Sequence, residues 1–90
     1  MIPKHRIPTH PGTILLEEFL EPIEMSQVEL ARRMGVPIQR VNTLVNGKRD
    51  VTAETAILLA RVLKTTSEFW MNLQVALDLY KASKHLGRAA

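Results

Sequence analysis

The sequence contains no cysteine, which excludes disulfide bonds and thiolate chemistry and fits a cytoplasmic protein. It has no apolar run of about 18 residues, the length that a membrane-spanning helix needs. Its first twelve residues also lack the apolar stretch of a signal peptide. Glycine and proline are sparse, and no segment is repetitive. We therefore expect the 90 residues to form one small domain that does not contact a membrane.

Residue combinations typical of enzymes are also missing. The three histidines, His5, His10 and His85, lie near the two ends of the chain, and no pair has the spacing of metal ligands on one helix face. Glu17 and Glu18 are adjacent, so on a helix they point in different directions and do not bracket one substrate. We expect no enzymatic activity, no metal or other cofactor, and no small-molecule substrate.

The charges that are present are distributed unevenly. Residues 11–29 contain five glutamates and no cation, whereas residues 30–49 contain five cations and no acid. Opposite blocks of this kind in one small domain suggest separate faces for separate partners, although a solvated surface remains the simpler explanation of the acids. The five cations are Arg32, Arg33, Arg40, Lys48 and Arg49.

Apolar periodicity and capping residues predict an all-α fold with five helices and no strand. The helices are expected at about residues 11–20, 26–35, 37–46, 52–64 and 66–83. In this division residues 1–10 form an N-terminal leader, residues 11–83 form the domain, and residues 84–90 form a frayed tail.

The fifth expected helix carries more apolar surface than one contact can cover. One stripe, which can close the domain core, consists of Phe69, Leu73, Leu77 and Tyr80. The other stripe consists of Met71, Val75, Leu79 and Ala82. Unless the helix is buried deep in its own core, this second stripe needs a partner. We expect a homodimer whose interface contains Trp70 and the second stripe.

Residues 26–46 meet the steric requirements of a helix-turn-helix unit. Ser26, with Glu29 three residues on, is a capping signature for the first helix. Ala31 is small where two helices cross closely, and Gly35 tolerates the left-handed turn between them. The apolar positions that would face the rest of the domain are Leu30, Met34, Val36, Val41 and Leu44.

Double-stranded DNA is the expected partner of this unit. In a helix-turn-helix the second helix lies in the major groove and turns its N-terminal half toward base edges. The expected base-reading residues are Ile38, Gln39, Asn42 and Thr43. The expected phosphate-binding residues are Ser26, Gln27, Arg40, Asn46, Lys48 and Arg49. Single-stranded nucleic acid is disfavoured, because it is bound by stacking on aromatic residues and residues 26–50 contain none.

These residues also carry a family resemblance. Residues 26–50 resemble the helix-turn-helix of Xre/Cro-type phage repressors. The segment "RIPTHPGTILLEEFLEPIEMSQVELARRMGV" is similar to the opening of HigA/VapI-type antitoxins, and "VTAETAILLARVLKTTSEFWMNLQVALDLYKA" resembles their usual ending. The resemblance covers residues 6–82, and its flanking signatures are far more specific than the helix-turn-helix alone.

The resemblance implies an antitoxin of a type II toxin–antitoxin module. Such proteins neutralise a small RelE-like toxin of the HigB kind, which cleaves messenger RNA. As dimers, commonly built with C-terminal helices, they bind a palindromic operator and repress their own operon. Gln27 matches the family's phosphate-contacting glutamine. Two positions depart from the family pattern, because Pro37 replaces a capping Ser or Thr and Ile38 replaces a polar reader.

The toxin-binding surface is suggested by charge alone. An acidic segment would suit a basic, RNA-binding toxin, and it consists of Glu17, Glu18, Glu21 and Glu24. Two other functions remain open at this point. One is a stand-alone repressor with no toxin. The other is a protein-interaction module that has lost DNA binding, which Pro37 and Ile38 favour and the retained cations disfavour.

Overall fold

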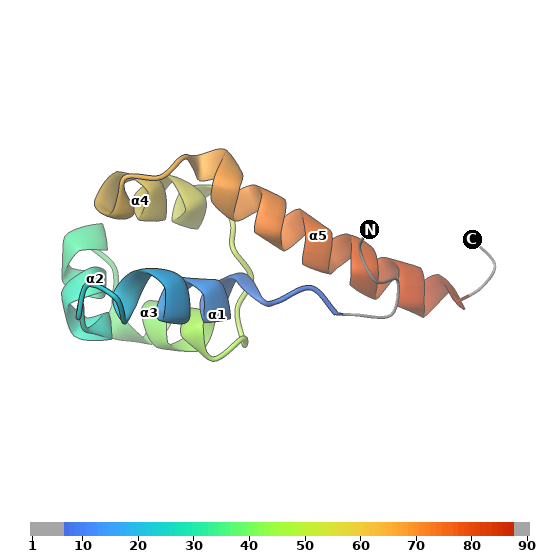
Figure 1. The fold of residues 1–90 in the computed structure, drawn as a ribbon, viewed down its shortest axis with the longest axis horizontal. Helices are drawn as coiled ribbons and strands as arrows, with labels where there is room; N and C mark the ends of the chain where they lie inside the picture. Colours follow the sequence, from blue (N-terminus) through green and yellow to red (C-terminus); the bar gives the residue numbers. More distant parts are fainter. Residues whose placement is uncertain (1–6, 88–90) are drawn as a thin grey trace.

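The chain folds into helices joined by short loops. A computed structural model describes residues 7–87 and shows no strand among them (Figure 1). The elements are α1 (Pro11–Ile14), η1 (Leu15–Leu20), α2 (Gln27–Met34), α3 (Ile38–Val45), α4 (Ala53–Leu63) and α5 (Ser67–Leu86). The predicted all-α fold is confirmed, with α1 and η1 together forming the first of the five helices.

The two ends of the chain differ from the expectation in one respect. Residues 7–10 are irregular, as predicted for the leader, and residues 1–6 and 88–90 lie outside the described part. The frayed tail was expected to begin at residue 84, but α5 continues to Leu86 and is capped at Gly87, so the predicted start of the tail is too early. Apolar and helix-favouring residues persist through this stretch, so the helix has no local reason to stop earlier.

The first helix changes its hydrogen bonding half-way along. His10 caps it, with Nδ1 accepting from the Gly12 N–H at 2.8 Å. Residues Leu15–Leu20 form π-helical turns, in which an N–H bonds the carbonyl five residues earlier, as the Glu21 N–H does to Leu16 at 2.9 Å. The wider turn brings residues five apart onto one face, and Leu15 and Leu20 are both buried. The uniform α-helix predicted for residues 11–20 is therefore corrected in its second half.

Gly12 is the point where α1 meets α3. A Cβ at this position would lie 1.8 Å from the carbonyl oxygen of Leu44. Only glycine permits so close an approach between two backbones. The N-terminal helix is thereby packed directly on the C-terminal half of α3.

Trp70 occupies the centre of the core and is fully buried. Its ring packs against Phe19 and Phe69, with centroids 5.1 and 5.0 Å away, and its Nε1 donates to Thr65 Oγ1 at 2.8 Å. This corrects the prediction that Trp70 lies in a dimer interface. Trp70 and Met71 are neighbours in sequence, but about 100° of helical rotation separates them, which turns the indole inward.

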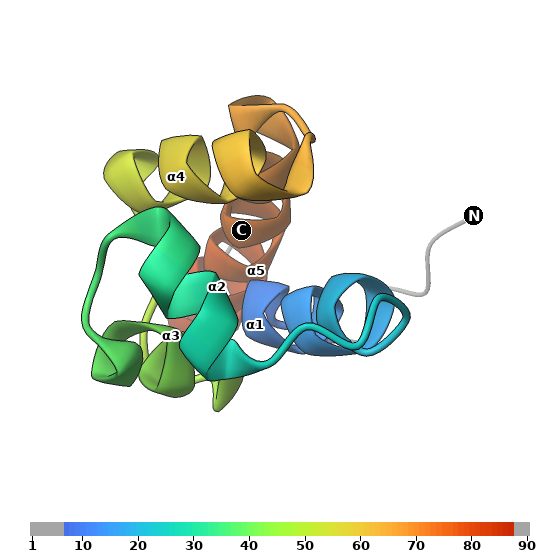
Figure 2. The ribbon, with the colours of Figure 1, turned by 90° about the vertical axis from the view of Figure 1, so that its left-hand side faces the viewer.

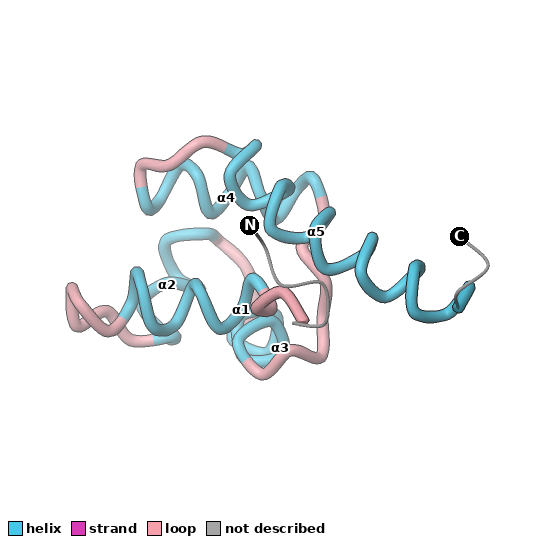
Figure 3. Tube along the Cα trace, turned by 45° about the vertical axis from the view of Figure 1, so that its right-hand side comes forward, coloured by secondary structure: helices cyan, strands magenta, loops and turns pink. Residues whose placement is uncertain are grey.

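The long C-terminal helix gives the molecule its shape. Residues in the first half of α5 pack on the other helices, while its C-terminal half extends beyond them (Figures 1 and 3). The principal extents are 45 × 23 × 21 Å, so this one helix accounts for the elongation. Seen along the long axis, α2 and α3 lie together on one side and α4 lies above them (Figure 2).

Candidate nucleic-acid interface

Helices α2 and α3 form the predicted helix-turn-helix. Ser26 caps α2, its Oγ accepting from the Glu29 N–H at 3.0 Å. Gly35 ends the helix in the left-handed region, with φ 73°, and the Val36 N–H then bonds back to the Ala31 carbonyl at 3.0 Å. Ala31 is buried where the helices cross. Local sequence chemistry thus sets the angle between the two helices.

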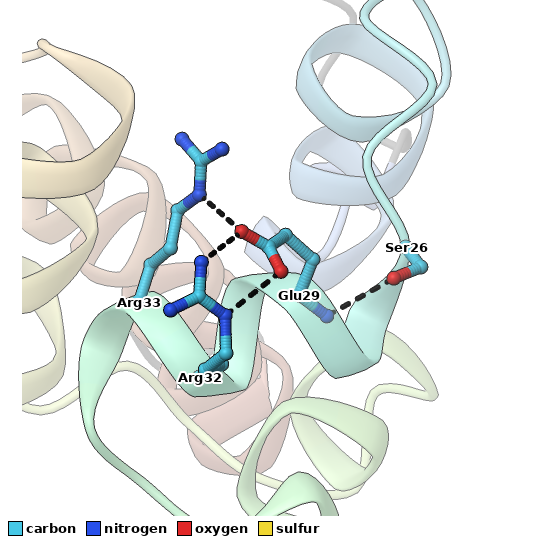
Figure 4. A network of polar contacts seen from close by, with 4 residues as sticks. All are labelled: Ser26, Glu29, Arg32 and Arg33. Atoms are coloured by element: carbon cyan, nitrogen blue, oxygen red, sulfur yellow. Dashed lines mark hydrogen bonds and ion pairs between the residues drawn. The ribbon is translucent and has the colours of Figure 1, made fainter.

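The acid–base pairs on α2 neutralise part of the basic block. The Glu29 carboxylate accepts from Arg32 at 2.9 and 2.6 Å and from Arg33 at 2.7 Å (Figure 4). Hydrogen bonds from Arg32 and then Arg33 lower the pKa of Glu29 to about 2, so it stays ionised at any physiological pH. The Glu29 side chain is therefore hydrogen-bonded to the two arginines. The predicted cap of α2 is made by the Ser26 hydroxyl.

The expected reading residues lie on the surface of α3. Gln39 and Asn42 are exposed, and Ile38 and Thr43 are half-buried. Pro37 provides no side-chain cap, as its chemistry requires. The Asn42 Nδ2 donates to the Gln27 Oε1, which joins the start of α2 to the middle of α3. Two polar amides from different helices are thus held against each other at the surface.

Thr43 is more constrained than the sequence suggests. Its Oγ1 donates to the Gln39 carbonyl at 2.8 Å and accepts from the Arg49 Nε at 3.1 Å. The hydroxyl is therefore engaged within the chain. Its methyl group is the part left for contact with a base, as an apolar reader of thymine would use it.

Arg40, one of the expected phosphate-binding residues, is paired with an acid on α4. Its Nη2 donates to Glu54 Oε1 at 2.8 Å and to Thr55 Oγ1 at 3.2 Å, and only 24% of its side chain is exposed. The guanidinium therefore links α3 to α4. Sequence reasoning missed this because the partner acid is 14 residues away, with no periodic relation to Arg40.

The loop after α3 carries the remaining cations. Asn46, Lys48 and Arg49 are all exposed, and among residues 7–87 neither Lys48 nor Arg49 is paired with an acid. The Lys48 N–H bonds the Thr43 carbonyl at 2.8 Å, which folds the loop back on the end of α3. Ser26 and Gln27, at the start of α2, are also at the surface. An exposed polar helix flanked by free cations and a helix N-terminus is suited to a polyanion.

Comparison with known proteins decides the family. The family described as Helix-turn-helix matches residues 16–70 of this chain. The chain belongs to the helix-turn-helix family of the Xre type. The members named below are DNA-binding regulators and antitoxins rather than enzymes.

Three relatives illustrate the match. The uncharacterized HTH-type transcriptional regulator YbaQ of Escherichia coli K12 is 44% identical over 81 residues, which is 90% of this chain and 72% of YbaQ. The antitoxin HigA-1 of Vibrio cholerae is 45% identical over 75 residues, 83% of this chain and 70% of HigA-1. The structure of Pseudomonas aeruginosa antitoxin HigA with the higBA promoter has a TM-score of 0.84 at 38% identity, covering 92% of this chain and 95% of that one.

The second apolar stripe of this helix-turn-helix protein lies on the surface of α5. Val75 is 46% exposed and Leu79 is 66% exposed; Ala82 is also exposed and Met71 is half-buried. In the first stripe Leu77 is buried, Leu73 and Tyr80 are half-buried, and Phe69 is 37% exposed. The predicted division therefore holds for Leu77 on the inward side and for Val75, Leu79 and Ala82 on the outward side. Met71 departs from it, because it packs against the core. The dimer itself stays a prediction.

The acidic segment is also at the surface. Its four glutamates, on η1 and the turn that follows, are all exposed: Glu17, Glu18, Glu21 and Glu24. Within residues 7–87, no group of three or more acidic, histidine or cysteine residues could hold a metal ion. No helix in that range is long and apolar enough to cross a membrane.

Two residues contact the cation-bearing loop from opposite parts of the fold, and sequence reasoning gave neither a role in DNA binding. The imidazole of His10 lies beside Gly47, where an added Cβ would be 3.8 Å from its Cδ2. Burial lowers the pKa of His10, partly offset by Asp50, which favours the neutral ring that its cap requires. From α5, the buried Gln74 Oε1 accepts from the Val51 N–H at 2.8 Å.

Proposed function

We propose that this helix-turn-helix protein is the antitoxin and autorepressor of a type II toxin–antitoxin operon. It binds a palindromic operator as a homodimer and neutralises a RelE-like toxin that cleaves messenger RNA. The observation that carries DNA binding is the exposed polar face of α3, flanked by the exposed Lys48 and Arg49, neither of which pairs with an acid within residues 7–87. The likeness to an antitoxin solved with its promoter supports the same function.

In this proposal α3 enters the major groove. Gln39 and Asn42 present amides that can hydrogen-bond to adenine, while Ile38 and the Thr43 methyl contact thymine methyl groups. One of the two N–H groups of the Asn42 amide donates to Gln27. Its remaining N–H and its carbonyl oxygen face the bases with a fixed orientation. Pro37 and Ile38 make the start of α3 more apolar, which favours contact with thymine methyl groups there. The polar groups of Gln39 and Asn42 are retained.

Phosphates on either side of the groove are met by separate parts of the chain. The first backbone N–H groups of α2, beside Ser26 and Gln27, form a helix N-terminus that attracts an anion. Lys48 and Arg49, with Asn46, contact phosphates at the other end of α3. Two-fold symmetry then requires the two α3 helices to lie about 34–36 Å apart, one turn of DNA.

The purified protein is expected to bind its own promoter fragment tightly and to lose affinity steeply as salt rises, because phosphate contacts release counterions. An unrelated fragment of equal length is the control, and both are titrated at two salt concentrations. Equal binding to the two fragments would contradict sequence reading by α3. A lack of binding to either would favour a protein-interaction module.

Readers and phosphate anchors are distinguished by two single substitutions. Lys48→Ala is expected to weaken all sequences alike and to reduce the log–log salt slope by about one. Thr43→Ser, which removes the methyl group and keeps the hydroxyl that bonds Arg49, is expected to change preference at one base pair by about 1–3 kcal/mol. Competition titrations with single-base operator variants measure both effects. A change of sequence preference in Lys48→Ala would contradict this assignment.

Toxin neutralisation is assigned to the acidic segment, whose exposed carboxylates suit a basic, RNA-binding protein. Glu17→Lys with Glu21→Lys is expected to weaken toxin binding at least tenfold, because attraction becomes repulsion across the contact. Glu68→Lys, at an exposed acid on α5, is the matched control. Calorimetry against the toxin encoded beside this gene gives the affinities. Unchanged binding would place the toxin elsewhere, and the absence of such a neighbouring gene would favour a stand-alone repressor.

A further inference from the structure

The loop that carries Lys48 and Arg49 has little regular structure of its own. It runs from the end of α3 to the cap of α4 at Thr52 (Figures 1 and 3). The N–H of Val51 lies outside both helices, and Val51 is only 3% exposed. A buried backbone N–H that no helix satisfies needs another acceptor.

Gln74 provides that acceptor from α5. Its Oε1 accepts from the Val51 N–H at 2.8 Å, 23 residues away along the chain. Its Nε2 donates to Asp78 Oδ1 at 2.9 Å. A carboxylate on one side and an N–H on the other fix which end of the amide faces the loop. Gln74 is 3% exposed and its bond to Val51 is buried, so water does not compete for that bond, whereas Asp78 at the other end is exposed.

The loop is held from a second direction as well. The ring of His10 lies against Gly47, and its orientation is fixed by the cap bond to Gly12. Contacts from the start of α1 and from α5 therefore bracket the segment that holds Lys48 and Arg49. Both cations then lie beside the end of α3, where Thr43 also bonds the Lys48 N–H and the Arg49 Nε.

We infer that Gln74 is a positioning residue for DNA binding: by anchoring Val51 it holds the loop so that Lys48 and Arg49 meet phosphates while α3 occupies the groove. The inference rests on the proposed function. Because Gln74 belongs to the helix that bears the proposed dimer face, it also makes each loop move with α5. In a dimer, this buried amide therefore links the phosphate-binding loop of each chain directly to the helix that bears the proposed interface.

The test is Gln74→Met, which keeps the length of the side chain and removes both hydrogen bonds. Operator affinity is expected to fall about tenfold, and the log–log salt slope to decrease by about one to two, because one or two phosphate contacts are lost. Sequence preference and dimerisation are expected to stay unchanged. Asp78→Ala is the matched variant: it removes only the outer bond, and its affinity is expected to fall no more than about threefold.

A rescue variant separates positioning from simple loss of stability. Gln74→Glu combined with Asp78→Asn keeps an oxygen facing the Val51 N–H and reverses the outer bond, since the new amide can donate to the new carboxylate. The salt slope is expected to return to that of the unchanged protein even if the melting temperature does not. If Gln74→Met fails to fold, the same comparison is made between Gln74→Glu alone and the double variant.

Two results would overturn the inference. One is a Gln74→Met protein that melts earlier but binds, when folded, with unchanged affinity and salt slope. The other is a rescue variant that stays as impaired as Gln74→Glu alone. Failure of the proposed function looks different, because the unchanged protein would then show no salt-sensitive, promoter-selective binding.

Discussion

Val75→Glu with Leu79→Glu is expected to leave the chain folded and to weaken operator binding at least a hundredfold. Both side chains are exposed on α5, so in a single chain the glutamates remain in water and cost little. In the proposed dimer they would be buried opposite each other without partners, which opposes association. A chain that binds one half-site alone loses the avidity of two linked readers, typically a factor of about 10²–10⁴.

Sedimentation at several protein concentrations measures association, and titration of the same promoter fragment measures affinity. Ile23→Glu is the matched control, because Ile23 is 58% exposed but lies before α2, away from α5. The control is expected to dimerise and bind as the unchanged protein does. If the α5 variant remained dimeric while the Ile23 variant did not, the dimer interface would have to be placed near the acidic segment.

Helix boundaries could be predicted because they depend on chemistry within three or four residues. Ser26, Thr52 and Thr66 each cap a helix, accepting the N–H three residues on at 3.0, 3.3 and 3.1 Å. Gly35 ends α2 for an equally local reason, since its φ is 73°. The same local patterns place Gln39 and Asn42 on the exposed side of α3, with Ile38 and Thr43 half-buried beside them.

Contacts between distant segments could not be predicted in this way. Arg40 looks like any other cation of the basic block until Glu54 is brought beside it, and Gln74 looks like a surface amide until Val51 needs an acceptor. Both depend on where α4 and α5 come to rest. The site can therefore be read from the sequence as a set of exposed residue types, whereas the residues that position it emerge only from the packing.

Trp70 shows how much depends on the exact face of a helix. Trp70→Ala is expected to destabilise the fold by about 3–5 kcal/mol, because it removes a fully buried indole and leaves a cavity. The Thr65 hydroxyl also loses its partner. Domains of this size are stable by only about 5–15 kcal/mol, so the variant is expected to be largely unfolded at 37 °C or to melt tens of degrees earlier.

Urea unfolding of Trp70→Ala and Val75→Ala at two protein concentrations tests the assignment. Val75 lies five residues further along α5, and its truncation is expected to change the free energy of unfolding of the single chain by less than about 1 kcal/mol. If Trp70 stabilises the core of each chain, the difference in free energy of unfolding between the two variants persists at concentrations low enough to dissociate a dimer. A Trp70→Ala protein that kept its single-chain stability and lost only association would instead indicate that the indole lies in the dimer interface. Loss of the core instead removes the support for α1 and α2, the helices that pack on α3, so operator binding would disappear together with the fold.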